Sequence, residues 1–394
     1  MAVWQTYAQI PGGAGQETGA NPVRSRHCDR SSPRGPTGSQ TLTHRLTVRP
    51  HVDQGTRIPR RGPAMSRHRA ALRALAPALL LIPLAACAGS PTAGDGKGTA
   101  ATAAAGFPYT VTNCGVSSTY QAPPKRAVTM NQHATEILLA LGLEDRVVGS
   151  AYLDDAVLPA YRPAYDKIKV LAAEYPSKEV LLGADPDFVY GGYSSAFDKA
   201  QGRDREGLAK SGIDSRLSVE YCTDGRVGLD QLKTEITEVA RTFGVPERGA
   251  ELIRDEQRRI DAVTARVKDL PRPSVFVYDS GETSAFTSGG KGIGNEIVSL
   301  AGGTNSFADL DDTFGDVSWE KVIERAPETI LIYDYGGTTV EAKKQRLLND
   351  PALAAVPAVK NQRFVVLPLS SAVLGVRVAD AVESLGRQLH PDTP

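Results

Sequence analysis

The chain has 394 residues, 41% of them hydrophobic, and its 45 basic side chains are balanced by 45 acidic ones. Such a length suits two domains that can each bury a core. The formal net charge of zero gives no sign of nucleic-acid binding.

Residues 1–64 differ in composition from the rest of the chain. They are rich in Arg, Pro, Gly and Ser and show no apolar periodicity. Such a segment cannot bury enough surface to offset its ordering entropy. We therefore interpret residues 1–64 as a non-native or disordered extension, and Met65 as the start of the translated protein.

A leader sequence begins at Met65. A short basic stretch precedes an apolar run that ends at Ala86, which is the pattern of a signal peptide over residues 65–86. The apolar run is shorter than the ~20 residues that a membrane-spanning helix needs. Leu84–Ala86 resembles the lipobox of bacterial lipoproteins, so we expect Cys87 to be lipidated.

Residues 87–106 consist mostly of Ala, Gly, Thr and Ser, a composition typical of a flexible tether. Downstream of Cys87 only two cysteines remain, Cys114 and Cys222. An even pair in an exported protein is more often a disulfide than a reactive site. We therefore predict a Cys114–Cys222 disulfide.

Residues 107–244 alternate short β-rich runs with helical patterns, and we interpret them as an N-terminal lobe. The predicted strands are Tyr109–Asn113, Ala127–Met130, Arg146–Gly149, Phe188–Gly191 and Ile213–Val219. The predicted helices are His133–Leu141, Ser177–Ala184, Ser195–Ser211 and Leu229–Phe243.

Residues 245–271 predict one long amphipathic helix. Pro246 suits a first helical turn, and Ile253, Ile260, Val263 and Val267 recur at the spacing of one helical face. At about 1.5 Å per residue, a helix over Pro246–Leu270 is roughly 37 Å long. An ordinary surface helix would show the same pattern, but the α/β units on both sides favour a strut between two lobes.

Residues 272–394 repeat the alternation and form the predicted C-terminal lobe. Its predicted strands are Ser274–Asp279, Thr329–Tyr333 and Arg363–Leu367. Its predicted helices are Gly294–Ala301, Ser318–Arg325, Val340–Leu348 and Val376–Leu389. Strands separated by helices imply parallel sheets covered on both faces, so the fold class is α/β with two three-layer αβα lobes.

A short repeat links the lobes. The S-x-E motif that ends at Glu179 and the one that ends at Glu320 are each followed, at the same spacing, by Pro and an acidic residue. In each copy the serine caps a helix and the proline ends it. The simplest interpretation, without a role in binding, is that both glutamates stabilise the start of their helix locally.

The whole pattern resembles the class III substrate-binding lipoproteins of ABC importers, which capture iron–siderophores and cobalamin. Pro124–Val128, Phe286–Gly289 and Ala301–Gly303 also fit that family. The resemblance implies a monomeric, non-enzymatic protein, lipid-anchored to the outer face of the cytoplasmic membrane, whose partners are a permease dimer and its ATPase. It also implies that Glu179 and Glu320 meet arginines on the two permease subunits.

Ligands of open α/β sheets bind beyond the carboxyl ends of the strands, where the predicted strands place several tyrosines. About half of these are expected to be core aromatics instead. The family resemblance adds Phe314, where relatives place an aromatic against a corrinoid, and Arg377, near the cleft in relatives. The tyrosine candidates are Tyr152, Tyr175, Tyr190, Tyr193, Tyr278, Tyr333 and Tyr335.

Other chemistries are poorly supported. After Cys87 only His133 and His390 remain, too few for a histidine-rich metal site, and we expect a structural role for His133. Lys291 lacks the following Ser or Thr of a P-loop, and no G-x-S-x-G elbow is present. We expect no resident cofactor and a metal-chelate ligand, most simply a ferric siderophore. Cobalamin, haem or a flavin-type ligand remains the alternative within transport, and a secreted hydrolase the alternative from another class.

Overall fold

The computed structural model describes residues 104–392. The predicted extension, signal peptide and Cys87 lie outside the described residues, as does most of the tether. No helix within residues 104–392 is long and apolar enough to cross a membrane. We use the name N-lobe for residues 107–244 and C-lobe for residues 272–392.

The N-lobe is built on a parallel sheet of five strands in the order β5-β4-β3-β6-β7. Its strands are β3 (Ala127–Met130), β4 (Val147–Ala151), β5 (Val170–Ala172), β6 (Phe188–Gly191) and β7 (Asp214–Leu217). Its helices are α1 (Gln132–Ala140), α2 (Arg162–Tyr165), α3 (Lys178–Gly183), α4 (Arg205–Lys210) and α5 (Leu229–Thr242).

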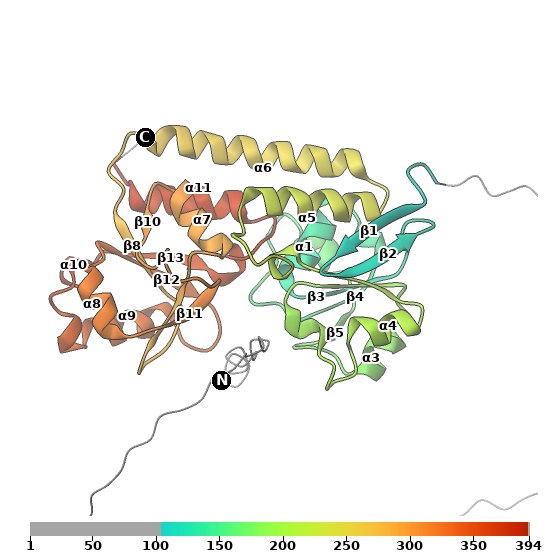
Figure 1. Ribbon diagram of the computed structural model, residues 1–394, viewed down its shortest axis with the longest axis horizontal. Coiled ribbons are helices and arrows are strands. Elements are labelled where there is room, and N and C mark those ends of the chain that lie inside the picture. The colour runs from blue at the N-terminus through green and yellow to red at the C-terminus, as the bar shows by residue number, and fades with distance from the viewer. Residues whose placement is uncertain (1–103, 393–394) are drawn as a thin grey trace, which may run out of the picture. The chain divides into compact units, whose positions relative to one another are not determined.

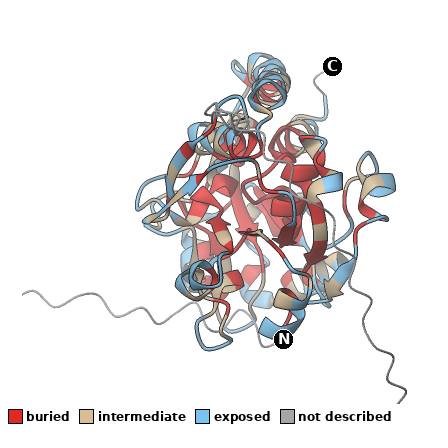
Figure 2. Ribbon diagram, turned by 90° about the vertical axis from the view of Figure 1, so that its right-hand side faces the viewer, coloured by how far each residue is buried: buried red, intermediate tan, exposed pale blue. Residues whose placement is uncertain are grey.

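Alternate residues of these strands face opposite layers, as the period of a strand requires. Ala127 and Phe188 pack in one apolar cluster with α1 and α5. Val128 and Val189, their direct neighbours in sequence, pack in a second cluster with α3 and α4. This lobe is therefore a three-layer αβα sandwich, and Figure 2 shows its strands as buried between more exposed helices.

The C-lobe repeats the plan with a parallel sheet of four strands in the order β10-β8-β12-β13. Its strands are β8 (Ser274–Tyr278), β10 (Thr304–Asn305), β12 (Thr329–Asp334) and β13 (Phe364–Pro368). One face packs against α7 (Ile293–Leu300) and α11 (Val378–Leu389), and the other against α8 (Trp319–Arg325), α9 (Val340–Leu348) and α10 (Pro357–Lys360). The predicted α/β class with two three-layer lobes is confirmed.

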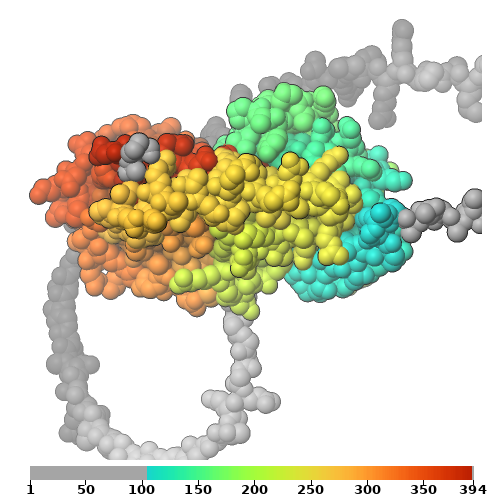
Figure 3. All heavy atoms as spheres, turned by 90° about the horizontal axis from the view of Figure 1, so that it is seen from above, coloured from blue at the N-terminus to red at the C-terminus, as the bar shows by residue number. Residues whose placement is uncertain are grey.

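The helix α6 (Pro246–Val267) joins the lobes and packs on both. It runs along α5 and then along α11 in Figure 1, and Figure 3 shows it crossing from one lobe to the other with its outer face uncovered. Gly249 permits the close approach to α5, because a Cβ there would lie 2.5 Å from the Ala240 Cβ. Towards the other end, the Arg259 guanidinium pairs with Asp380 and Glu383 of α11.

Several parts of the chain depart from the sequence-based expectation, and β5, β10, α2 and α10 were not predicted. β1 (Tyr109–Asn113) is a strand, but it pairs antiparallel with β2 (Val116–Tyr120), outside the parallel sheet. A second antiparallel pair, β9 (Ala285–Ser288) with β11 (Phe314–Val317), was not predicted.

The predicted helix Ser195–Ser211 is wrong. Residues Ser194–Phe197 form a 3-10 turn, and the α-helix begins only at Arg205. The Asp198 side chain accepts a hydrogen bond from the Ala200 N–H, and the Asp204 side chain accepts one from the Gly207 N–H. Such local side-chain bonds compete with helix formation before Asp204 and cap a helix that starts after it.

The Cys114–Cys222 disulfide is present, as predicted, and ties the tip of the β1–β2 hairpin to the turn after β7. Next to it, the Asn113 side chain donates to the Leu217 carbonyl and accepts from the Leu217 N–H, at 2.8 and 2.9 Å. The hairpin is thus fastened to the edge strand of the sheet both covalently and by hydrogen bonds.

We expect the double variant Cys114→Ser/Cys222→Ser to lose about 4–5 kcal/mol of unfolding free energy, because the bond closes a loop over a sequence separation of 108 residues. Urea titration of the oxidised protein and the variant measures this difference. A variant that unfolds at the same urea concentration as the oxidised protein would contradict the prediction.

Candidate functional site

The carboxyl edge of the N-lobe sheet is organised by Asn131, the residue between β3 and α1. Its backbone has a positive φ of 82°, a conformation that non-glycine residues adopt at a cost and that often marks functional sites. Its side-chain oxygen accepts hydrogen bonds from the N–H groups of Gly192 and Tyr193, at 3.2 and 3.1 Å. Its amide nitrogen donates to the Tyr175 hydroxyl at 3.0 Å.

Three predicted tyrosines lie at this edge. Tyr152 follows β4 and packs edge-on against Tyr175, with 4.7 Å between ring centroids; both are half-buried. Tyr193 follows β6, is buried, and donates its hydroxyl to Asp154 at 3.2 Å. Burial raises the pKa of Asp154 to about 6. The edge thus offers phenol rings and hydroxyls beside an acceptor whose charge varies near neutral pH.

His133 lies beneath the same edge, packed edge-on against Tyr193 at 4.9 Å between ring centroids. It is only 2% exposed, and burial lowers its pKa to about 4, so the imidazole is neutral at physiological pH. Its burial suits the expected structural role, but neither ring nitrogen has a hydrogen-bond partner within residues 104–392, and the structural role stays a prediction.

The carboxyl edge of the C-lobe sheet carries a second polar group of side chains. Tyr335 follows β12 and donates its hydroxyl to Asp279, which follows β8. Lys343 of α9 lies over the Tyr335 ring at 4.5 Å and donates to the Tyr333 carbonyl at 2.5 Å. Burial raises the pKa of Asp279 and lowers that of Lys343. The half-buried Tyr335 is therefore held in place by the acidic side chain of Asp279 and the basic side chain of Lys343.

Phe314 lies on β11 and is half-buried, with its ring stacked on that of Phe286 at 5.8 Å and 13°. Its edge faces Tyr333, 6.5 Å away between ring centroids. The β9–β11 pair therefore presents two stacked aromatic faces beside the carboxyl ends of the C-lobe strands, a surface suited to a flat ligand.

Tyr190, Tyr278 and Tyr333 are buried core side chains in this structure, with exposed fractions of 0%, 3% and 1%. Tyr190 donates its hydroxyl to Glu235 on α5. Tyr278 donates to the Gly281 carbonyl at 2.9 Å. These positions favour packing, as expected for about half of the tyrosines, and ligand contact by these three stays a prediction.

Arg377, at the start of α11, joins the two lobes. Its guanidinium donates two hydrogen bonds to Glu136 of α1, at 2.7 and 2.6 Å, and one to the Ala156 carbonyl at 2.7 Å. The buried, bidentate geometry is that of a strong ion pair. An anionic ligand group would have to displace Glu136, so ligand contact by Arg377 also stays a prediction.

Glu179 and Glu320 occupy equivalent positions on the two lobes. Each is the second residue of its helix and is exposed, and each follows a capping serine. The backbone N–H of Glu179 and the hydroxyl of Ser177 lower the pKa of Glu179, and the hydroxyl of Ser318 and its own backbone N–H lower that of Glu320. α3 and α8 lie away from α6 in Figure 1. Both carboxylates are therefore ionised and accessible to a partner.

Two further observations concern metal sites and cavities within residues 104–392. Residues 104–392 contain no group of three or more His, Cys, Asp or Glu side chains arranged to hold a metal ion. A cavity of about 370 Å³ lies among Leu270, Arg272, Glu328, Arg363 and His390, at the amino ends of β8, β12 and β13. It is at the opposite edge of the C-lobe sheet from Tyr335 and Asp279.

Several polar residues of the two edges escaped the sequence analysis. Asn131, Asp154, Asp279 and Lys343 are single polar residues in unremarkable local patterns, and their contacts join segments that are distant in sequence. Asn131 and Asp279 do follow strands directly, which was the one available signal.

Comparison with known proteins agrees with this architecture. The family model described as periplasmic binding protein matches residues 128–370, more than half of the chain. A vitamin B12-binding protein of Vibrio parahaemolyticus is 26% identical over 209 residues, which cover 53% of this chain and 70% of that protein.

Two solved structures cover most of the folded part. A periplasmic binding protein from Veillonella parvula is 30% identical, with a TM-score of 0.67, over 72% of this chain and 97% of that one. An ABC-type Fe3+-hydroxamate transport system protein from Saccharomonospora viridis is 27% identical, with a TM-score of 0.62, over 72% and 99%. The chain is therefore a non-enzymatic, class III substrate-binding component of an ABC importer and belongs to the periplasmic binding protein family.

Proposed function

We propose that this protein captures a ferric siderophore outside the cytoplasmic membrane and delivers it to an ABC permease. The aromatic side chains at the carboxyl ends of the strands support this proposal. Four of them are half-buried and offer ring faces and hydroxyl groups to a bulky chelate: Tyr152, Tyr175, Phe314 and Tyr335. The similarity to the Fe3+-hydroxamate transport protein supports the same ligand class.

Cobalamin is the second candidate, because the similarity to the vitamin B12-binding protein favours it. The same stacked pair, Phe286 and Phe314, would suit a corrin ring. The family resemblance implies tryptophans in cobalamin binders at several places where this chain has tyrosines, which makes cobalamin the weaker candidate.

Native mass spectrometry of the protein exposed to culture supernatant, followed by visible absorption of the complex, identifies the ligand class. In parallel, a ferric trihydroxamate chelate, the same chelator without iron, and cobalamin are titrated into the purified protein. We expect the ferric chelate to bind stoichiometrically. Binding of cobalamin alone would replace the first candidate by the second.

Phe314→Leu is expected to weaken chelate binding roughly tenfold, because one stacked aromatic contact is lost while the apolar volume is kept. Phe243→Leu is the matched control: Phe243 is buried behind the N-lobe sheet, against Phe188, and cannot reach a ligand at the carboxyl edges. Equal affinities of the Phe314 variant and the unmodified protein would remove this residue from the site.

We propose that the mature protein is anchored by lipid on Cys87. A lipoprotein carries several acyl chains, and more than one chain is needed for stable attachment. Cys87→Ala is expected to move the protein from the membrane fraction to the soluble fraction, which immunoblotting of fractionated cells measures. A full-length variant that stays with the membrane would refute the anchor.

A further inference from the structure

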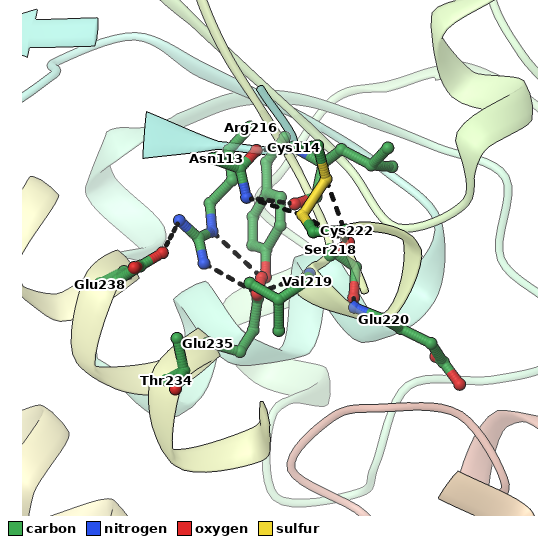
Figure 4. Close-up of polar contacts among 12 residues, drawn as sticks. Asn113, Cys114, Arg216, Ser218, Val219, Glu220, Cys222, Thr234, Glu235 and Glu238 are labelled. Atoms are coloured by element: carbon green, nitrogen blue, oxygen red, sulfur yellow. Dashed lines mark hydrogen bonds and ion pairs between the residues drawn. A yellow bond between two sulfur atoms is a disulfide. The ribbon is translucent and has the colours of Figure 1, made fainter. Parts of the chain in front are cut away.

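The short turn Val219–Tyr221, between β7 and Cys222, is held in place from several directions. Cys222 is bonded to Cys114, the Val219 N–H donates to Glu235 at 2.9 Å, and the Ser218 N–H donates to the Gly191 carbonyl at 3.0 Å. Figure 4 shows the disulfide and Glu235 next to the turn, with the Glu220 side chain pointing away from the disulfide.

The Glu220 side chain extends from the N-lobe and contacts backbone groups of the C-lobe. Its side chain is buried, and its carboxylate accepts a hydrogen bond from the Leu374 N–H at 3.2 Å and one from the Ile293 N–H. Ile293 is the first residue of α7, whose N-cap, Gly292, has no side chain with which to cap the helix. Glu220 therefore supplies from the N-lobe the acceptor that the first turn of α7 lacks.

Leu374 belongs to a segment of the C-lobe that lies against the N-lobe over residues 370–377, here called the seam segment. The Ser370 hydroxyl donates to Asp155 at 2.5 Å, and a Cβ at Gly375 would lie 3.0 Å from the His133 Cβ. Val376 packs in the N-lobe cluster with Ala134 and Ile137. Glu220 thus acts in the middle of the contact between the lobes.

We propose that Glu220 is a positioning residue, which holds the seam segment and the first turn of α7 against the N-lobe, and that the Cys114–Cys222 disulfide keeps Glu220 in place. The proposal does not depend on which ligand the protein carries. It adds a polar tie between the lobes to the connection made by α6.

The environment of the carboxyl group supports this role. Burial raises the pKa of Glu220 to about 7, opposed by the two backbone N–H groups, while the charge of Glu235 on α5 adds to the rise. A buried carboxyl without a specific partner would lower the stability of the folded protein, and an apolar side chain at that position would make the protein more stable. The two C-lobe N–H groups that Glu220 reaches across the lobe boundary explain its presence.

Amide hydrogen exchange of the apo protein tests the proposal at two backbone groups, Leu374 and Ile293. In Glu220→Ala we expect both to exchange roughly tenfold faster, because each loses its acceptor. Glu220→Gln is expected to restore slow exchange, because the amide oxygen still accepts. A Gln variant that exchanges like the Ala variant, or an Ala variant that exchanges like the unmodified protein, would overturn the proposal.

The control variant is Glu256→Ala. Glu256 on α6 is also a buried glutamate that accepts from a C-lobe backbone group, the Ala379 N–H at 3.0 Å. Its removal is expected to accelerate exchange at Ala379 and leave Leu374 and Ile293 unchanged, whereas Glu220→Ala should do the reverse. Acceleration of all three amides by either variant would indicate general loosening and contradict a specific tie.

Reduction of the Cys114–Cys222 disulfide tests whether this bond keeps Glu220 in place. In the unmodified protein, reduction is expected to accelerate exchange at Leu374 and Ile293. In Glu220→Ala, reduction should add nothing at these two amides, because the group through which the disulfide acts is already gone. Equal acceleration in both proteins would show that the disulfide does not act through Glu220.

Discussion

Glu235→Ala is expected to destabilise the protein by about 3–5 kcal/mol, because it removes the buried partner of Arg216 and leaves that charge, in the core of the N-lobe, paired only with the partly exposed Glu238. Glu235 is completely buried and accepts two hydrogen bonds from the Arg216 guanidinium, at 3.1 and 2.8 Å. It also accepts from the Tyr190 hydroxyl and the Val219 N–H. Figure 4 shows the Arg216 guanidinium pointing toward Glu235 and Glu238.

A loss of that size is a large fraction of the total stability of a typical domain, about 5–15 kcal/mol, and urea titration resolves it easily. Glu238→Ala is the matched control. Glu238 accepts one bond from the same guanidinium at 2.8 Å, but its side chain is 24% exposed and Arg216 keeps both bonds to Glu235. We expect it to cost under about 1.5 kcal/mol.

A second variant separates the charge from the packing. Arg216→Met with Glu235→Leu removes both charges and fills the space, so it should be more stable than Glu235→Ala alone. If Glu235→Ala unfolds at the urea concentration of the unmodified protein, or if Glu238→Ala costs as much, the buried ion pair is not the source of stability assigned to it.

Replacing both Glu179 and Glu320 with arginine is expected to reduce uptake of the ligand at least tenfold while leaving its affinity for the purified protein unchanged. The permease arginines implied by the family resemblance would then meet like charges, which opposes both encounter and orientation. Uptake of radiolabelled iron chelate by cells and titration of the purified variant measure the two quantities separately.

The chain contains a close control pair, Glu206 and Glu341. Each is an exposed acid at the second position of a capped helix, one on each lobe, after Asp204 and Thr339 as the caps. Arginine at both control positions changes net charge and helix ends in the same way. If the control pair impairs uptake as strongly as the test pair, or if the test pair loses ligand binding, the docking role of Glu179 and Glu320 is wrong.

The helices that the sequence predicts well are those whose pattern is local. Val340–Leu348 has the predicted bounds, and its capping residue, Thr339, precedes it directly. Strand Tyr109–Asn113 was also placed correctly, but its partner was not, because antiparallel pairing with Val116–Tyr120 depends on a tight turn at Cys114 that alternation of residue types does not reveal.

The candidate site was harder to predict because its contacts are made across long stretches of chain. The aromatic residues were found from their position after strands. Whether each faces solvent or the core depends on packing that sequence does not show: Tyr190 points to Glu235, whereas Tyr335 remains half-buried. Arg377 was found by resemblance, but its pairing with Glu136 spans 241 residues.

The boundary between the two main apolar clusters does not coincide with the boundary between the lobes. Leu232 and Ile236 of α5 pack with Val263 of α6 in the apolar cluster of the C-lobe, while Val239 and Ala240 of α5 pack in the cluster of the N-lobe. One helix therefore completes two cores. A chain cut on either side of α6 would leave an apolar stripe uncovered, so neither half is an independent folding unit and heating should melt both lobes together in one cooperative step.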